Sequence, residues 1–198
     1  VIDTYSDVAH HAVEVEGGGT RFGSGEAMIE KIELLGPSGE PTSLVNTGDA
    51  VSLRLHYRAK ERITAPVFGV SIDTREGIFV WGLHGIDACY VPTSIEPGTG
   101  HLDVNIPRLA LNPGSYTISA AIQNHDMTSV IDALQKARRF DVLPGPGMES
   151  GGIITLGASF SGLSPERPMR DIARRGAADF QRLARMQAQQ ADALGAED

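Results

Sequence analysis

The residues best placed to do chemistry are histidines closely followed by acidic side chains. His84 precedes Asp87 and His125 precedes Asp126, and both pairs come where predicted strands end and loops converge. Two imidazoles and two carboxylates would suit a divalent metal ion if those loops met. Loop residues of these types also serve commonly as solvated or capping groups, so we predict no metal site and no cofactor.

Motifs for catalysis are missing from the sequence. No glycine-rich phosphate loop ends in Lys-Ser or Lys-Thr, and 23–25 (Gly-Ser-Gly) has the wrong spacing for a nucleophile elbow. Cys89 has no evident His–Asn framework around it. Asp73, Asp87 and Asp126 are numerous enough for the paired carboxylates of glycoside hydrolysis, but no pattern sets two of them across a cleft. The sequence therefore predicts a binding protein and not an enzyme.

Polar side chains at outward strand positions match the chemistry that holds sugars. Ring hydroxyls favour planar donors, short hydroxyls and carboxylates, and the C–H face of a pyranose stacks on an indole. Trp81 is the only tryptophan, although its alternation with Phe79 and Leu83 also fits a core position. The candidate contact set is His56, Ser71, Asp73, Trp81, His84, Gln123 and His125.

Short apolar runs bounded by Gly, Pro, Asn and Asp must position these side chains. The run 51–57 alternates strictly, with Val51, Leu53, Leu55 and Tyr57 on one face. Short strands at near-regular spacing, without helical periodicity between them, indicate an all-β antiparallel sandwich. The predicted strands are 27–35, 51–57, 66–73, 77–83, 101–106, 115–123 and 139–143. The stretch 129–137 could form one or two helical turns, and 152–156 looks like one further strand.

The two ends of the chain have a different character. Residues 1–20 end in three consecutive glycines and are predicted to be an N-terminal linker. Ser164 is a good N-cap, followed by Pro165 at the first helical position. An amphipathic C-terminal helix is therefore predicted over 164–195, and its apolar stripe could dock on its own domain, fray in solution or pack on a partner helix.

Net charge and cysteine content limit the classes of partner and the cellular compartment that the sequence allows. The net charge is −8, from 17 basic and 25 acidic residues. From Ser164 onward there are six arginines and six acidic residues, so the body carries the whole excess. An acidic body lacks the basic stripe that nucleic-acid binding requires, so no nucleic-acid partner is predicted. A single cysteine suits a reducing compartment, and no apolar run approaches membrane-spanning length.

One stretch resembles a known family. Arg21–Ile29, running into Ile32–Leu35, is similar to the opening of the C-terminal carbohydrate-binding domain of Wzt-type ATP-binding proteins, which belong to bacterial ABC transporters that export O-antigen polysaccharide. Further matches follow in order at 48–49, 66–72, 77–82, 97–100, 111–116, 140–142 and 151–153, so the resemblance covers about 21–160. Two features depart from the pattern: 83–87 replaces an Asn-Thr type loop, and the helix after Pro165 is additional.

The resemblance implies an immunoglobulin-like sandwich that recognises the exported glycan, often near its modified non-reducing end. It also implies a homodimer that can form by exchange of the last strand, within 153–160. An ATPase domain is expected ahead of Val1, which would attach the chain to the transporter's membrane subunit and place it in the cytoplasm at the inner face of the cytoplasmic membrane. The alternative is a structural domain that dimerises through the sandwich and docks a partner through its tail helix. Ligand contacts vary with the glycan, so the resemblance transfers no site residue.

Overall fold

The computed structural model describes residues 13–15, 19–159 and 161–162. The chain divides into two units, Val1–Gly157 and Ala158–Asp198, and every strand in the described residues lies in the first. The helix predicted over 164–195 lies outside the described residues.

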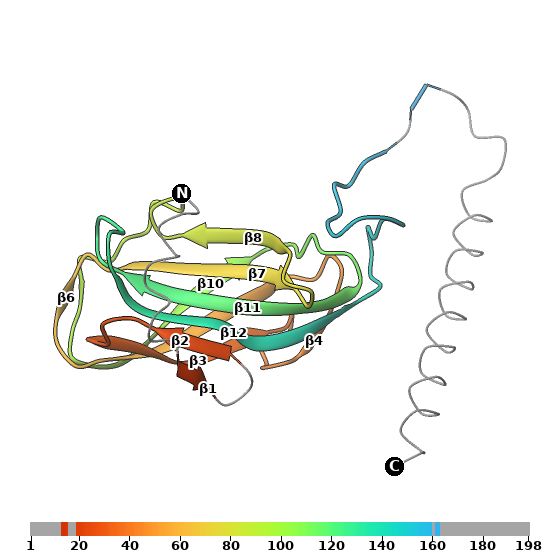
Figure 1. Ribbon diagram of the computed structural model, residues 1–198. Coiled ribbons are helices and arrows are strands. Elements are labelled where there is room, and N and C mark those ends of the chain that lie inside the picture. The colour runs from red at the N-terminus through yellow and green to blue at the C-terminus, as the bar shows by residue number, and fades with distance from the viewer. Residues whose placement is uncertain (1–12, 16–18, 160, 163–198) are drawn as a thin grey trace, which may run out of the picture. The chain divides into compact units, whose positions relative to one another are not determined.

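Seven strands form the large sheet. Its hydrogen-bonded order is β1 (Val13–Val15), β2 (Gly19–Phe22), β12 (Val130–Leu143), β11 (Gly114–Gln123), β7 (Val67–Thr74) and β8 (Phe79–His84). All these neighbours pair antiparallel, whereas β4 (Leu44–Asn46) joins the far half of β12 in parallel. Figure 1 shows β8, β7, β11 and β12 side by side in this order.

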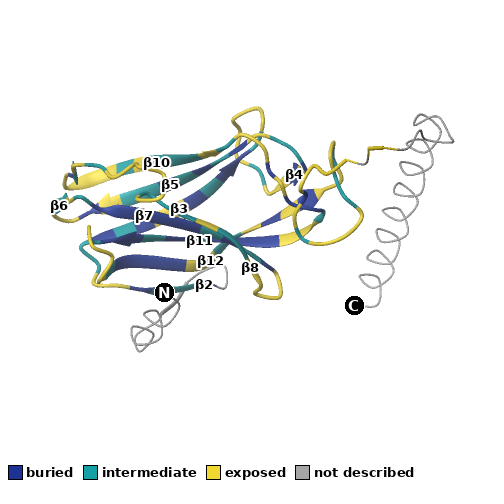
Figure 2. Ribbon diagram, turned by 90° about the horizontal axis from the view of Figure 1, so that it is seen from above, coloured by how far each residue is buried: buried dark blue, intermediate teal, exposed yellow. Residues whose placement is uncertain are grey.

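Three strands form the small sheet, in the order β10 (Gly98–Ile106), β5 (Val51–Ala59) and β3 (Ala27–Leu35). Both pairings are antiparallel. A separate short ribbon joins β6 (Ile63–Thr64) to β9 (Ser94–Ile95). Figure 2 shows the two sheets coloured by burial: buried residues run along β3, β11 and β12, whereas β10 at the edge of the small sheet has none. The predicted all-β antiparallel architecture is therefore confirmed.

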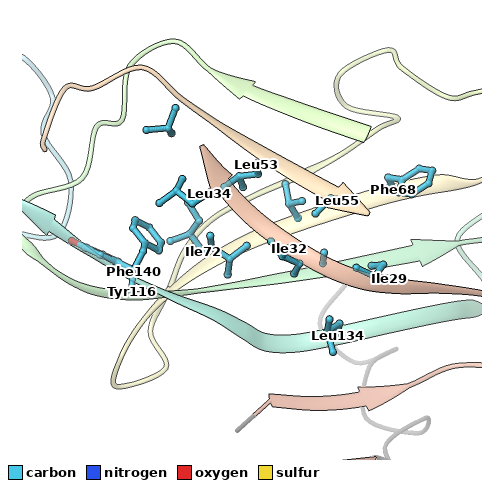
Figure 3. Close-up of a cluster of buried hydrophobic side chains, with 14 of the residues drawn as sticks. Ile29, Ile32, Leu34, Leu53, Leu55, Phe68, Ile72, Tyr116, Leu134 and Phe140 are labelled. Carbon is cyan, nitrogen blue, oxygen red and sulfur yellow. The ribbon is translucent and has the colours of Figure 1, made fainter. Parts of the chain in front are cut away.

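The core lies between the two sheets, because one face of each strand is apolar. Leu53 and Leu55 of β5 are at most 1% exposed, and they belong to the same core cluster as Ile118 and Ile122 of β11, which are fully buried. Figure 3 shows Leu34, Leu53 and Leu55 on one side of this cluster and Ile72, Tyr116 and Phe140 on the other. The alternation predicted for 51–57 and 115–123 correctly gave the inward residues.

The segment from Arg21 to Glu26 carries the chain from the large sheet to the small one. Gly23 has φ +142°, and a Cβ there would lie 2.4 Å from the carbonyl oxygen of Ile131 on β12. The backbone N–H groups of Ser24 and Gly25 donate to the carbonyls of Val130 and Ile131. Glycine at position 23 is therefore required both by the backbone conformation and by the close approach of β12.

A buried carboxylate ties the two sheets together at this crossing. Asp132 on β12 is 2% exposed, and its Oδ2 accepts a hydrogen bond of 2.7 Å from the backbone N–H of Ile29 on β3. The Nε of Arg21 lies 3.5 Å from Asp132 Oδ1, and the same guanidinium donates to the carbonyl of Ile29. Burial raises the pKa of Asp132, while the Ile29 N–H and the Arg21 charge act to lower it.

One secondary-structure expectation was wrong. The helical turns considered for 129–137 are instead the first half of β12, where Ala133 pairs with Ala121 on one side and with Phe22 on the other. A bulge near Lys136, whose φ is +51°, shifts the alternation of inward side chains along this strand. Asp132 also points inward, so a charged residue stands at a position where the alternation of a strand calls for an apolar one.

Strand pairing also occurs in the two terminal stretches. Within the predicted linker 1–20, Val13–Val15 pairs with Gly19–Arg21 as a hairpin. Within 152–156, only an isolated bridge forms, between Ile154 and Leu111 of the same chain. The backbone N–H groups of Asn112 and Thr155 donate to the carbonyls of Ile153 and Ala110, which holds this stretch in place.

The outer face of the small sheet is covered by paired polar side chains. Arg54 binds Asp103 with two hydrogen bonds of 2.8 Å, and His56 Nε2 lies 2.7 Å from Glu33 Oε2. Further pairs on this face join Ser52 to Asn105, Lys31 to Glu33 and Arg58 to Glu30. We call this set the polar ladder. All of these pairs except Lys31–Glu33, which lies within β3, join neighbouring strands, and cross-strand pairing stabilises a solvated sheet face.

The described residues contain no helix with the length and apolar character needed to cross a membrane.

The Asp132 contact predicts a large effect on stability. Asp132→Ala would leave the buried Ile29 N–H without its acceptor and the Arg21 charge without its carboxylate, so we expect the free energy of unfolding to fall by about 3 kcal/mol. Urea denaturation measures this. The matched control is Asp141→Ala, since Asp141 lies exposed on the same strand and accepts from Ser115; it should cost about 1 kcal/mol or less. Equal losses in the two variants would contradict the proposed role.

The polar ladder predicts a pH dependence. Hydrogen bonds from Arg54 are the main cause that lowers the pKa of Asp103. A carboxyl whose folded pKa lies below its unfolded value of about 3.9 stabilises the fold above that value, and the contribution is lost as pH falls through the folded pKa. The difference in unfolding free energy between wild type and Asp103→Asn should therefore be largest near neutral pH and shrink below about pH 4. High salt should also reduce it, because the pair is partly exposed. A difference that grows on acidification would rule this out.

Candidate functional site

The outer face of the large sheet is hollowed between β8 and β12. The depression has a volume of about 520 Å³ and crosses β8, β7, β11 and β12. We call it the outer groove. Its walls and floor are formed by Gly69, Val70, Ser71, Asp73, Phe79, Gly82, His84, Ser119, Ala120, Ala121, Ala133, Gln135 and Lys136.

Strand register arranges the outward side chains in rows that run across the strands. Gly69 pairs with Ala121, and Ala121 pairs with Ala133, so three of the smallest residues lie in one row. Adjacent strands lie about 4.8 Å apart, so a row across four strands spans about 14 Å. Gly69, Ala121 and Ala133 form the floor of the groove, which is hollow there because their side chains are missing or only a methyl group, and His84 of β8 ends the row.

Polar side chains occupy the next two rows. Ser71 pairs with Ser119, which places two hydroxyls directly beside the floor. Asp73 pairs with Thr117 in the row after that. The Oγ1 of Thr117 is buried and has no hydrogen-bond partner within the described part of the chain. The groove therefore combines a small apolar floor with hydroxyl and carboxylate groups along one side.

Two aromatic rings lie over glycines at the β8 side of the groove. A Cβ on Gly69 would lie 2.8 Å from Cδ2 of His84, and a Cβ on Gly82 would lie 2.9 Å from Cζ of Phe79. Neither glycine has a left-handed φ, so the backbone conformation does not require glycine there. Contact with the rings explains both residues, since glycine within a strand marks a close approach.

The β12 bulge turns two long side chains into the groove. Gln135 and Lys136 are consecutive, yet both line it. The backbone N–H of Lys136 donates to the Ser119 Oγ at 2.9 Å, which leaves the Ser119 hydroxyl hydrogen free to donate. The side-chain oxygen of Gln135 accepts a hydrogen bond of 3.2 Å from Thr20, so its amide N–H groups remain available.

Asp73 is the only carboxylate among the lining residues. Burial raises its pKa, while the Lys136 charge and the Ser71 hydroxyl act in the opposite direction. The groove therefore contains an acceptor-only group, Asp73, a donor-only group, Lys136, and several groups that can do both. This mixture can bind a ligand rich in hydroxyls.

The predicted contact set divides between several places. Ser71, Asp73 and His84 line the outer groove. His56 lies on the opposite sheet, within the polar ladder. Trp81 faces inward and packs against the core, which was the other interpretation of its pattern.

The last two residues of the set lie at the far end of β11. Gln123 ends β11 and is 5% exposed, with no partner for its Oε1 in the described residues. His125 lies exposed in the turn after β11 and does not line the groove.

Residues that the sequence analysis did not select make up most of the groove. They are Gly69, Val70, Phe79, Gly82, Ser119, Ala120, Ala121, Ala133, Gln135 and Lys136. Glycine at 69 and 82, inside two predicted strands, was the one usable signal, because such glycines often mark close approach of another group.

The histidine–carboxylate pairs do not combine into a metal centre. His84 Nδ1 lies 3.7 Å from Asp87 Oδ2, whereas Asp126 accepts hydrogen bonds from Thr128. Within residues 13–15, 19–159 and 161–162, no three His, Cys, Asp or Glu residues come together in a way that could hold a metal ion.

Solved structures similar to this chain include the crystal structure of the C-terminal domain of Wzt. It has a TM-score of 0.66 at 20% identity, covering 76% of this chain and 92% of that one. A Niemann-Pick type C2 protein from the Japanese carpenter ant has a TM-score of 0.44 at 9% identity, covering 61% and 96%. A Bacteroides uniformis β-glucuronidase has a TM-score of 0.40 at 12% identity, covering 55% and 14%. Only the first is similar enough to support the fold.

Sequence comparison with curated proteins found no match. The family model described as the Wzt C-terminal domain matches residues 19–156, which is well over half of the chain and includes all strands of both sheets except β1. The chain therefore belongs to the Wzt C-terminal domain family, as the resemblance of Arg21–Ile29 indicated.

Proposed function

We propose that this chain binds O-antigen polysaccharide in the outer groove, probing its terminal region, so that an ABC transporter can export it. Membership of the Wzt C-terminal domain family supports the transport setting. The two-layer antiparallel fold is consistent with the immunoglobulin-like sandwich of the proposal. The observation that carries the binding site is the groove, a depression of about 520 Å³ with a small-residue floor and polar walls.

The two outer sheet faces differ in their capacity to bind hydroxyls. On the small sheet, Arg54, His56 and Arg58 each contact a carboxylate of a neighbouring strand, so the polar ladder is already satisfied. On the large sheet, the Ser119 hydroxyl keeps a hydrogen to donate, and the amide N–H groups of Gln135 have no partner among the described residues. A polysaccharide gains more from groups whose hydrogen-bonding capacity is still available, because it displaces water and not an existing partner.

Binding without catalysis fits the composition of the groove. Glycoside hydrolysis normally uses two carboxyl groups on either side of the scissile bond. Asp73 is the only carboxylate among the lining residues. We therefore assign the groove a recognition role, with the chemistry of transport supplied by an ATPase domain.

In this proposal the chain works in the cytoplasm, at the inner face of the cytoplasmic membrane, joined through the ATPase domain to the membrane subunit. It acts as a homodimer in which the stretch 153–160 is exchanged. The argument for exchange is the place of Ile154, which comes after a segment rich in Pro and Gly. The bridge that Ile154 forms with Leu111 of its own chain can form in the same way with Leu111 of a second copy. Sedimentation equilibrium tests this point, and a monomer at micromolar concentration would contradict it.

The binding proposal predicts the result of a calorimetric titration. Purified O-antigen polysaccharide of the source strain should bind with a Kd between about 1 μM and 1 mM, typical of weak single-site contacts. Ala121→Phe should weaken binding by about tenfold or more, because the ring would occupy the floor of the groove and block contact with it. Ala121 is only partly buried on the outer face, so the variant should still fold, which its thermal unfolding checks.

His56→Ala is the matched control, since His56 lies on the opposite sheet. It should bind like the wild type. Loss of binding in His56→Ala with retention in Ala121→Phe would move the site to the polar ladder. No binding by the wild type would favour the structural alternative, in which sandwich and tail serve only assembly.

A further inference from the structure

The lining of the outer groove is balanced in charge, although the chain as a whole has a net charge of −8. Asp73 comes from β7 and Lys136 from the β12 bulge, with β11 between them. The Lys136 charge acts to lower the pKa of Asp73, yet none of the salt bridges among the described residues joins the two. A carboxylate, which also receives the Ser71 hydroxyl, and an ammonium therefore both face the groove.

The position of Lys136 is set by the backbone. Its φ of +51° lies in the left-handed region, which is unfavourable for a residue with a side chain. The hydrogen bond from its N–H to Ser119 holds that conformation. Its Nζ lies 3.6 Å from where a Cβ of Gly77, in the β7–β8 turn, would be. The lysine therefore reaches across the sheet from β12 to the hairpin beyond β7.

Phe79 supplies an apolar surface at the same end. It is 66% exposed, although it lines the groove and its ring rests on Gly82. It is the only Phe, Tyr or Trp among the lining residues. An exposed ring next to paired donor and acceptor groups matches a pyranose, which has an apolar C–H face and hydroxyls around its edge.

We propose that the outer groove selects an uncharged pyranose, which stacks on Phe79 and shares its hydroxyls between Asp73 and Lys136. This inference rests on the proposed function and adds the chemical class of the sugar. An acidic sugar would gain one contact with Lys136 but would bring its carboxylate close to Asp73, which is repulsive at short range. A hydroxyl can donate to Asp73 and accept from Lys136 without that cost.

The test is whether each of two substitutions weakens or strengthens binding. The Kd is measured by calorimetry with the purified O-antigen polysaccharide of the source strain. For an uncharged sugar, Asp73→Asn and Lys136→Met should each weaken binding by about tenfold, because each loses a charge-assisted hydrogen bond. For an acidic sugar, Asp73→Asn would strengthen binding, since a repulsive charge is removed. Stronger binding by Asp73→Asn therefore overturns the inference and leaves the proposed function intact.

Salt and the aromatic ring give two independent measurements. Raising the salt concentration from about 0.05 M to 0.5 M should leave the Kd for an uncharged sugar nearly unchanged, whereas binding that weakens strongly would overturn the inference. Phe79→Ala should weaken binding by about three- to tenfold. Ile78→Ala is its matched control, because Ile78 is 55% exposed in the same hairpin and does not line the groove. Equal effects of Phe79→Ala and Ile78→Ala on the Kd would contradict stacking of the sugar on Phe79.

The results that would contradict polysaccharide binding differ from those that would contradict only the pyranose assignment. If the wild type binds no polysaccharide at any salt concentration, both proposals fall together. If the wild type binds but neither groove charge matters, the polysaccharide is held elsewhere, which overturns the pyranose assignment while binding itself remains. Thermal unfolding of each variant separates loss of binding from loss of fold.

Discussion

A buried carboxylate on β12 is the contact on which the arrangement of the two sheets depends. Asp132 belongs to the large sheet but accepts its hydrogen bond from Ile29 of the small sheet, and Arg21 binds both partners. Isolated burial of a charge would be costly, so the guanidinium and the backbone N–H are needed together. Gly23 permits this contact, because its missing side chain lets the crossing segment lie against Ile131. The motif that identifies the family is therefore structural in its role.

The same strand also builds the groove on its other face. Asp132 points into the core while its neighbour Ala133 points out and forms part of the groove floor. Three residues later, the bulge at Lys136 changes the direction of the side chains and places two polar groups at the groove wall. Because inward and outward residues alternate on one backbone, the tie between the sheets also fixes the position of the site. A shift of β12 by one residue would exchange the two sets.

The two outer faces illustrate how a sandwich can keep one side closed and the other open to a ligand. Charged residues on the small sheet satisfy one another across three strands, with Arg54 and Asp103 in the best geometry. The large sheet has glycine and alanine at corresponding outward positions, so its surface is hollow. Glycine inside strands weakens a sheet by roughly 0.5–1 kcal/mol relative to alanine. The rings of Phe79 and His84 cover Gly82 and Gly69 and offset part of this loss.

Alternation of apolar residues was sufficient to predict most strands, the antiparallel sandwich and the inward residues of 51–57 and 115–123, because the period of two is a local property. It failed at 129–137, where an inward aspartate and a bulge disturb the period. Ser71 and Asp73 were selected because they alternate with inward apolar residues and so point outward. Such alternation does not say to which sheet a strand belongs. His56 therefore lies on the sheet opposite the groove, and the alternation around Trp81 fitted an outward position and a core position equally well. Only register across β7, β11 and β12 brings Gly69, Ala121 and Ala133 into one row, and only tertiary packing makes that row a groove.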